Sequence, residues 1–437
     1  MSRTARRTSA RRDSQPAWND ANLAALRRAI DAASTHGLDP QRYHATALAD
    51  VHDELARDVL ATDAFLRLGS NLAHGAVDPQ FLRAAWCADA AIDLPAVLQA
   101  ALDGNSVEST LEHLAPADAR YQRLRQELQT LRTASWRGVP EGKKLHKGDH
   151  GPSIAALRER LGLDAKTDVF DNELVTALRD FQAHHGLTAD GVAGRDTIHE
   201  LNVSPADRAV QVAVNLERWR WMPRDLGPTH VIVNIAGFYL GVYTNGSETM
   251  AMKVIVGKLY HETPFFAARI SDVTLNPWWN VPEGIAEKEL WPKVQKQPSY
   301  LKREHMVVTS DNRIRQRPGP WNWLGRVKFE MDNQYNVYLH DTPAKSLFDS
   351  TVRTFSHGCI RLERPLDLAD FLLSDQPKWT RDNILSTIAR GEERTIPVTT
   401  PVPVYVLYWT AWPATDGDVE FHPDVYGADA RVAAALK

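Results

Sequence analysis

The sequence predicts an α+β protein with a helical N-terminal region, a small three-helix module and a β-rich C-terminal domain that carries a helical insertion. Two observations predict this class. Apolar residues recur at helical spacing through residues 16–134 and again through residues 154–201. From about residue 209 the pattern changes to runs of β-branched and aromatic residues, and Asn245-Gly246 joins two of these runs with the strongest short-range signal for a β-hairpin.

Composition narrows the classes of function. The chain has 437 residues, of which 43% are hydrophobic and 24% charged, so it can bury a sizeable core in several domains. A net charge of −4 without a broad basic field argues against a nucleic-acid partner. The two cysteines, Cys87 and Cys359, say little about the compartment, because a disulfide between them would occupy the residue that we identify below as the nucleophile.

The N-terminal region divides into a tail and a helical domain. Residues 1–15 are rich in arginine and no apolar stretch follows them, so we expect a disordered basic tail and neither a signal peptide nor a membrane span in this sequence. Residues 16–140 are predicted to form a helical scaffold domain. Its first helix would bury Leu23, Leu26 and Ile30 on one face and stop at Gly37.

A second helical unit, residues 146–203, follows a linker rich in Gly, Pro and Lys at residues 136–147. The spacing of its apolar residues predicts one helix that ends at Gly162, a second that ends before Gly186, and a third from Thr197 to Leu201. Such a unit is small enough that most of its patterned residues are needed for its fold.

Residues 208–427 are predicted to form the β-rich domain. The expected strands are residues 230–243, 250–256, 264–275, 305–309, 327–331 and 337–340. A helix from about residue 364 to 374 would begin at Pro365, where proline is favoured. Residues 283–301 are predicted to be mainly helical, with breaks at Pro292 and Pro298, within an insertion of about residues 283–325.

Cys359 and His340 are the candidates for chemistry. A cysteine between Gly358 and an aliphatic residue is poorly placed for inert packing, and a histidine that closes a strand can serve as its base. Gly358 can take a positive φ, which would turn the N–H groups of Gly358 and Cys359 toward one point, as an oxyanion hole requires. The alternatives are a buried free thiol and a structural histidine.

Further candidates lie around this pair. Tyr338 lies two positions before His340 and so on the same strand face, where its hydroxyl would reach a reacting carbonyl; an ordinary core aromatic is the alternative. Arg361 is suited to grip a substrate carboxylate through two parallel hydrogen bonds. Trp278 and Trp279 would line the substrate cleft or pack in the core.

The string Tyr338-Leu339-His340-Asp341, followed by Ser356-His357-Gly358-Cys359-Ile360-Arg361, resembles the signature of L,D-transpeptidases with a YkuD-type catalytic domain. Further strings place the chain near the large, YcbB-like Gram-negative members of this family. They are Glu217-Arg218-Trp219-Arg220-Trp221, Asn234-Ile235, Gly257-Lys258, Asn276-Pro277-Trp278-Trp279-Asn280-Val281-Pro282 and Tyr408-Trp409-Thr410-Ala411-Trp412. Phe65 and Asp78-Pro79 resemble the scaffold of these enzymes, and Gly148-Asp149, Phe181-Gln182 and Asp190-Gly191 resemble a peptidoglycan-binding module.

The resemblance implies roles for several residues. His357 would orient the site, and Ser356 would contact the substrate. The backbone carbonyl of Asp341 would orient His340. Many members carry Gly at this position, so the Asp341 side chain is an additional group here and is the alternative for that role. Arg361 stands where many members carry Asn, and the insertion would form a lid over the site.

The resemblance also implies the reaction. A thioester at Cys359 would form from a tetrapeptide stem of peptidoglycan, and a second stem would accept the acyl group in a 3-3 cross-link between diamino acid residues. The working compartment would be the periplasm. The alternatives are a thiol L,D-carboxypeptidase, a transferase that attaches protein to the wall, and a non-catalytic wall-binding protein, although the last has no need of Cys359 and His340. No cofactor, nucleic acid or metal is expected, since neither HExxH nor a paired-cysteine motif accompanies the 16 histidines.

Overall fold

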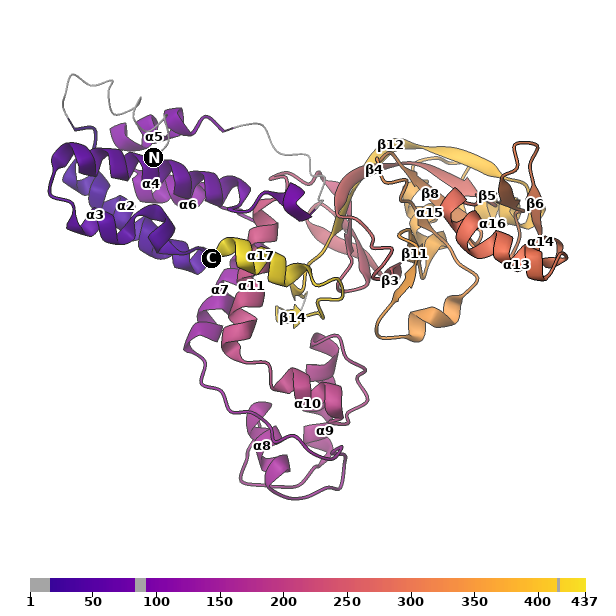
Figure 1. The fold of residues 1–437 in the computed structure, drawn as a ribbon, viewed down its shortest axis with the longest axis horizontal. Coiled ribbons are helices and arrows are strands. Elements are labelled where there is room, and N and C mark those ends of the chain that lie inside the picture. Colours follow the sequence, from indigo (N-terminus) through magenta and orange to yellow (C-terminus); the bar gives the residue numbers. More distant parts are fainter. Residues whose placement is uncertain (1–15, 83–91, 415–416) are drawn as a thin grey trace. The chain divides into compact units, whose positions relative to one another are not determined.

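The computed structural model describes residues 16–82, 92–414 and 417–437. The predicted tail and Cys87 lie outside the described residues. The chain forms two compact units (Figure 1), one made of Met1–Arg224 with Trp409–Lys437 and the other of Asp225–Tyr408. The catalytic region expected at residues 208–427 is therefore longer at both ends than the second unit.

The first unit is mainly helical. Helix α2 (Asp20–Ala32) begins at Asn19, whose side chain accepts a hydrogen bond from the Asn22 N–H, and it buries the three apolar residues whose spacing predicts it. Gly37, at φ +74°, ends the 3₁₀ turn that follows, and a Cβ there would lie 2.8 Å from the Cβ of Ala213. The remaining elements of this unit outside the small module are η1 (Ala33–His36), η2 (Pro40–Tyr43), α3 (Ala45–Asp50), α4 (Glu54–His74), η3 (Pro79–Leu82), α5 (Leu94–Asp103), α6 (Val107–Leu114), α7 (Ala119–Thr133), α11 (Pro205–Arg220), β13 (Ala411–Pro413), β14 (Val419–Phe421) and α17 (Ala428–Leu436).

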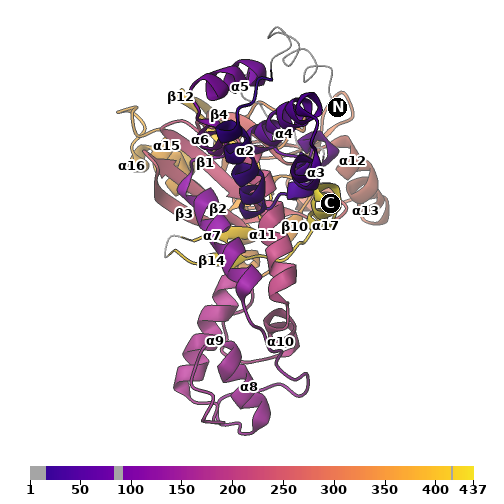
Figure 2. The ribbon, with the colours of Figure 1, turned by 90° about the vertical axis from the view of Figure 1, so that its left-hand side faces the viewer.

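The predicted three-helix module consists of α8 (Pro152–Arg160), α9 (Asn172–His184) and α10 (Arg195–Leu201), which Figure 2 shows grouped together. Its core is formed by Ile154, Leu157, Leu174, Leu178, Ile198 and Leu201. The buried amide of Gln182 ties the last loop to α9, because its nitrogen donates to the Val192 carbonyl at 2.9 Å and its oxygen accepts from the Gly191 N–H at 2.8 Å.

The second unit is built on a sheet of nine strands in the order β10-β3-β11-β9-β8-β4-β12-β1-β2. Strands β2 and β3 also pair, so all strands but β10 form a closed barrel without free edges. The strands are β1 (Thr229–Asn234), β2 (Tyr239–Thr244), β3 (Ser247–Gly257), β4 (Phe266–Leu275), β8 (Val327–Met331), β9 (Leu339–His340), β10 (Thr354–Ser356), β11 (Ile360–Leu362) and β12 (Arg394–Leu407). Helices η5 (Lys345–Asp349), α15 (Pro365–Leu372) and α16 (Arg381–Arg390) complete the unit, and α15 begins at Pro365 as predicted.

One strand prediction is wrong, and several short strands and the long strand β12 were not predicted. Residues 230–243, predicted as one strand, form the β1–β2 hairpin, because the chain turns at Gly237 and at Phe238, which has φ +51°. Strand β12 is absent from the predicted strands, because its prolines interrupt the strand pattern. The hairpin at Asn245-Gly246 is confirmed, and both residues have positive φ.

The insertion between β4 and β8 forms a separate layer of the second unit. It contains β5 (Trp279–Asn280), α12 (Glu283–Ile285), η4 (Ala286–Leu290), α13 (Trp291–Lys296), α14 (Tyr300–Arg303), β6 (Met306–Val308) and β7 (Ile314–Gln316). The predicted break at Pro298 is confirmed between α13 and α14. The predicted break at Pro292 is wrong, since the chain remains helical there and widens instead into the π-helical turn η4 directly before Trp291.

Candidate active site

The register of two parallel strands brings the candidate residues together. Strand β9 pairs with β11 so that His340 lies beside Arg361. Tyr338 and Cys359, each two positions earlier in its chain segment, therefore also lie next to each other. Side chains two positions apart point to the same face, so all four share one face of the barrel wall. Lys328 joins them from the antiparallel neighbour β8, where it is paired with His340.

Cys359 is a free, half-buried thiol. Burial raises the pKa of this thiol above its ordinary value, while hydrogen bonds from Tyr338 and the charges of Lys328 and Arg361 oppose the shift. The thiol therefore rests in its neutral form. Its sulfur lies 4.0 Å from the Asn336 carbonyl.

His340 is buried, and its Nδ1 donates a hydrogen bond to the Asp341 carbonyl at 2.5 Å. Burial and the neighbouring charge of Arg361 lower the pKa of the imidazole to about 3, although hydrogen bonds to the Asp341 and Leu324 backbones oppose the shift. The ring is thus a neutral imidazole at ordinary pH. The Tyr338 and His340 rings meet edge to face with centroids 5.6 Å apart, and among the described residues no hydrogen bond joins the Cys359 thiol to His340.

Asp341 contacts the base through its backbone alone. Its Oδ2 accepts from the Arg326 N–H at 2.8 Å, and its Oδ1 pairs with Lys345 Nζ at 2.8 Å. Gly325, at φ +64°, packs so closely that a Cβ there would lie 2.3 Å from Oδ2. Of the two Asp341 groups considered from the sequence, the backbone carbonyl is therefore the one that contacts the His340 ring.

The loop before Cys359 is held by two buried hydroxyl groups. Ser356 Oγ accepts from the Gly358 N–H at 3.1 Å and donates to the Cys359 carbonyl at 2.5 Å. Thr263 Oγ1 donates to the Gly358 carbonyl at 2.8 Å and accepts from the Gly257 N–H at 2.9 Å. Since a peptide plane points its C=O and N–H in opposite directions, the Cys359 N–H points away from Thr263.

This loop geometry corrects two expectations. Ser356 is 1% exposed and binds the loop backbone, so its hydroxyl does not face a substrate. Gly358 has the expected positive φ of +113°, but its N–H is already bonded to Ser356, which leaves the Cys359 N–H as the loop's candidate oxyanion donor.

His357 is held from the opposite side. Its Nε2 lies 2.6 Å from Oε1 of Glu289 and 3.4 Å from Nζ of Lys258, and its ring centroid is 5.0 Å from that of His261. Glu289 belongs to η4 of the insertion. His357 therefore contacts the insertion, while neither Cys359 nor His340 is among its hydrogen-bond partners in the described residues.

A cleft of about 1110 Å³ opens over Cys359 within this unit. Its lining includes Cys359, Gly358, His357, Tyr338, Trp278 and Trp279, together with most of α12 and η4. Trp279 also belongs to the insertion's own core at 5% exposure, and Trp278 is half-exposed with the Arg315 guanidinium 4.6 Å from its ring centroid. The two alternatives for the tryptophans therefore both hold in part.

Arg361 lies on the barrel wall and outside the cleft lining. Its guanidinium is half-buried, its Nε has no hydrogen-bond partner among the described residues, and burial lowers the pKa of the group.

Sequence reasoning missed Thr263, Lys328 and Glu289. Thr263 and Glu289 are distant in sequence from the Cys359 loop that they contact, and no local pattern marks them. Lys328 occupies a strand position where its partner on β9 can be identified only once the sheet order is known.

In the described parts of the chain, no group of three or more His, Cys, Asp or Glu side chains is arranged to hold a metal ion. The same residues include no helix that is both long and apolar enough to cross a bilayer.

A closed barrel with a cysteine, a neutral histidine and an arginine on one wall beneath a cleft defines a candidate thiol acyltransferase. Three family models match the chain. Residues 228–404 match YkuD, the L,D-transpeptidase catalytic domain, residues 5–128 match the Scaffold domain, and residues 156–201 match the "Putative peptidoglycan binding domain". The chain thus carries a YkuD-type L,D-transpeptidase catalytic domain together with a scaffold domain and a peptidoglycan-binding domain, and the predicted fold class is confirmed.

Individual proteins are also similar. A "Putative L,D-transpeptidase" of Haemophilus influenzae is 32% identical over 243 residues, which cover 51% of this chain and 48% of the relative. The chain therefore spans about half the length of that relative. Among solved structures, an L,D-transpeptidase of Xylanimonas cellulosilytica is 15% identical with a TM-score of 0.21, over 61% of this chain and 99% of the other. L,D-transpeptidase 3 of Mycobacterium tuberculosis is 12% identical with a TM-score of 0.22, over 41% and 61%.

Proposed function

We propose that the chain is a periplasmic L,D-transpeptidase that joins peptidoglycan stem peptides through a thioester at Cys359. The observation that carries the proposal is the β9–β11 register, which aligns Tyr338, His340, Cys359 and Arg361 on one wall. Of these four residues, Tyr338 and Cys359 line the cleft. The catalytic, scaffold and peptidoglycan-binding matches support it.

The first half-reaction forms the thioester. The Cys359 sulfur attacks the carbonyl of the third, diamino residue of a tetrapeptide stem. His340 takes the thiol proton on Nε2, the nitrogen that is unprotonated while Nδ1 donates to the Asp341 carbonyl. The C–N bond to the terminal D-residue then breaks, and the leaving amine takes the proton from His340. A neutral imidazole suits this exchange, because it can accept a proton before it donates one.

The second half-reaction transfers the acyl group. The side-chain amine of a neighbouring stem attacks the thioester, its proton passes to His340, and the Cys359 thiolate leaves and is reprotonated. In both halves the Cys359 N–H and the Tyr338 hydroxyl stabilise the oxyanion. The reaction needs no ATP, since the new peptide bond replaces the one that was cleaved.

Arg361 supplies donor selectivity. A half-buried guanidinium without an ion partner costs desolvation energy, and a substrate carboxylate would offset that cost with two parallel hydrogen bonds. A tetrapeptide places the carboxylate of its terminal D-residue next to the cleaved bond, whereas a pentapeptide places it one residue further away. Misplacement of the reacting carbonyl by about 1 Å costs on the order of a hundredfold in rate.

Intact-protein mass spectrometry tests the proposal. A disaccharide tetrapeptide should leave a stem adduct on Cys359 with loss of one D-residue, the pentapeptide should leave none, and a carbapenem should form a stable adduct at the same residue. Cys359→Ala should lower turnover about 10³-fold or more, while Cys87→Ala serves as the matched control. An adduct from the pentapeptide, or turnover by the Cys359 variant, would contradict the assignment. Release of a free tripeptide without cross-linked dimers would identify a carboxypeptidase.

A further inference from the structure

The π-helical turn η4 gives the insertion a specific contact with the loop before Cys359. In η4 the Trp291 N–H bonds to the carbonyl of Ala286, five residues earlier. Pro292 follows, and because it has no N–H it cannot continue the ordinary ladder of hydrogen bonds. π-Turns are rare and often occur at functional sites.

The turn aims two neighbouring residues in different directions. Leu290 is fully buried in the insertion's core, whereas the half-buried Glu289 lines the cleft and meets His357 with 2.6 Å between Oε1 and Nε2. The Glu289 side chain is 33% exposed and the His357 side chain 23%, so solvent screens this pair only in part.

The charges around Glu289 favour the contact. Burial raises the pKa of this carboxyl, but the hydrogen bond from His357 and the charges of His357, Lys258 and Lys293 outweigh burial and lower the pKa overall. The carboxylate therefore remains ionised and can accept a hydrogen bond from His357 in either protonation state of the imidazole.

His357 directly precedes Gly358, and the peptide between Gly358 and Cys359 carries the candidate oxyanion donor, the Cys359 N–H. Thr263 and Ser356 hold the Gly358 peptide from the barrel side, and Glu289 holds His357 from the insertion side. The Glu289–His357 pair thus joins η4 of the insertion to the loop before Cys359, and its loss would remove that hydrogen bond from both.

We propose that Glu289 is a positioning residue that latches the insertion onto His357, closing the cleft around a bound stem and fixing the loop that carries the Cys359 N–H. The inference rests on the proposed function only in naming a peptidoglycan stem as the molecule bound in the cleft. The contact between Glu289 and His357 lies within the chain and does not depend on that function. Large donors should need the closed state, whereas a small reagent should reach Cys359 in either state.

The test uses the full chain and three measurements on Glu289→Ala. Glu304→Ala is the matched control, since Glu304 is also a glutamate of the insertion but lies outside the cleft lining. Trypsin should cleave after Lys288, Lys293 and Lys296 about tenfold faster in the Glu289 variant. Acylation of Cys359 by the tetrapeptide should fall about tenfold, mainly through kcat, because a loosened loop misplaces the oxyanion donor. Alkylation by iodoacetamide should stay within about twofold of the parent.

A double-variant cycle shows whether Glu289 acts through His357. The double variant Glu289→Ala with His357→Gln should be cleaved by trypsin no faster than the faster of the two single variants. The cleavage rate of Glu289→Gln should lie between those of the parent and Glu289→Ala. Additive effects, or a Glu289 variant that behaves like the Glu304 control, would overturn the latch. If the parent takes up no stem at all, the proposed function fails, while trypsin cleavage and alkylation still decide the latch.

Discussion

A fully buried arginine in one unit and a half-buried arginine in the other differ in how their charge is paired. In the helical unit, Arg220 and Glu217 are both fully buried and lie 2.5 Å apart, and Arg220 also donates to the His36 carbonyl at 2.8 Å and to the Tyr121 hydroxyl at 3.1 Å. In the catalytic unit, the guanidinium of Arg361 makes no ion pair in the part of the chain that the structure describes.

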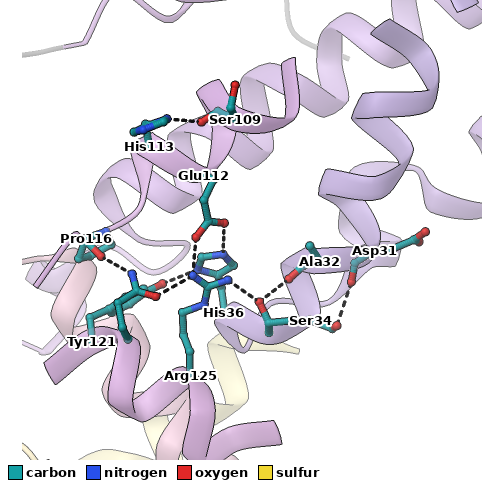
Figure 3. Close-up of polar contacts among 12 residues, drawn as sticks. Asp31, Ala32, Ser34, His36, Ser109, Glu112, His113, Pro116, Tyr121 and Arg125 are labelled. Atoms are coloured by element: carbon teal, nitrogen blue, oxygen red, sulfur yellow. Dashed lines mark hydrogen bonds and ion pairs between the residues drawn. The ribbon is translucent and has the colours of Figure 1, made fainter. Parts of the chain in front are cut away.

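The surroundings of Arg220 extend the same pattern of full pairing. Figure 3 shows His36 between the Tyr121 hydroxyl, at 2.8 Å from Nδ1, and Glu112, at 3.2 Å from Nε2, while Arg125 donates to the same Glu112. Burying a charge is costly unless it is paired and hydrogen-bonded. Complete pairing inside the fold therefore indicates a structural role for Arg220. Arg361 makes no ion pair among the described residues, and it is the arginine for which we propose a substrate carboxylate.

The largest effect is expected for Arg220→Met. Loss of the guanidinium leaves Glu217 ionised and unpaired in the core, which costs about 3–5 kcal/mol in the free energy of unfolding. Urea unfolding followed by far-UV circular dichroism should show this loss in the helical transition. Glu217→Gln combined with Arg220→Met should recover part of it, and a single variant as stable as the parent would remove the distinction between the two arginines.

A smaller effect, on rate alone, is expected for Arg361→Met. Acylation by the tetrapeptide should fall about 10–100-fold, equivalent to about 1.4–2.7 kcal/mol, with no loss of thermal stability, because no internal ion pair is broken. A tetrapeptide with a C-terminal amide supplies the control, since the parent should prefer the acid and the variant should not distinguish the two donors. Continued preference for the acid in the variant would place the carboxylate elsewhere.

The smallest effect, when it is counted for a change of one pH unit, concerns the protonation of His340. The pKa of His340 is about 3 in the fold against an ordinary 6.5, so the unfolded chain binds more protons between these values and the unfolding free energy falls as pH drops through that window. The slope reaches at most ~1.4 kcal/mol per pH unit. Hydrogen exchange at β8 and β9, corrected for intrinsic rates, should show this slope in the parent and lose it in His340→Gln.

His36 provides a comparison for the hydrogen-exchange experiment on His340. Burial also lowers the pKa of this histidine, while its hydrogen bond to Glu112 opposes the shift. His36→Gln should therefore flatten the pH dependence of exchange in α2 and leave that of β8 and β9 unchanged. Equal slopes at β8 and β9 in the parent and in His340→Gln would show that His340 is not held neutral by burial.

Local patterns predicted the parts of the fold that depend on local physics. Helical spacing located α2, α8 and α9, and the positive φ values required at Asn245-Gly246 located a hairpin. Strand β12 could not be found in this way. It contains Pro397, Pro401 and Pro403, and its register with β4 slips between Pro397 and Val402, the segment that holds Pro401.

The candidate site divides in a similar way. Cys359, His340 and Tyr338 could be selected from one signature, because all three lie in or directly before two short strands. Thr263, Lys328 and Glu289 could not, since their relation to Cys359 depends on sheet order and on a π-turn. Ser356 was selected for the wrong reason, because a sequence does not show whether a hydroxyl faces the cleft or the backbone.

The split of the helical unit across the sequence has a consequence for biosynthesis. Trp409 and Trp412 stack on Trp219 with ring centroids 4.5 and 6.1 Å apart, and Arg218 pairs with Asp429 at 2.6 Å. All of these partners follow the whole catalytic unit in the chain. A ribosome therefore makes most of the helical unit first, yet that unit can complete its core only after every residue of the barrel has emerged.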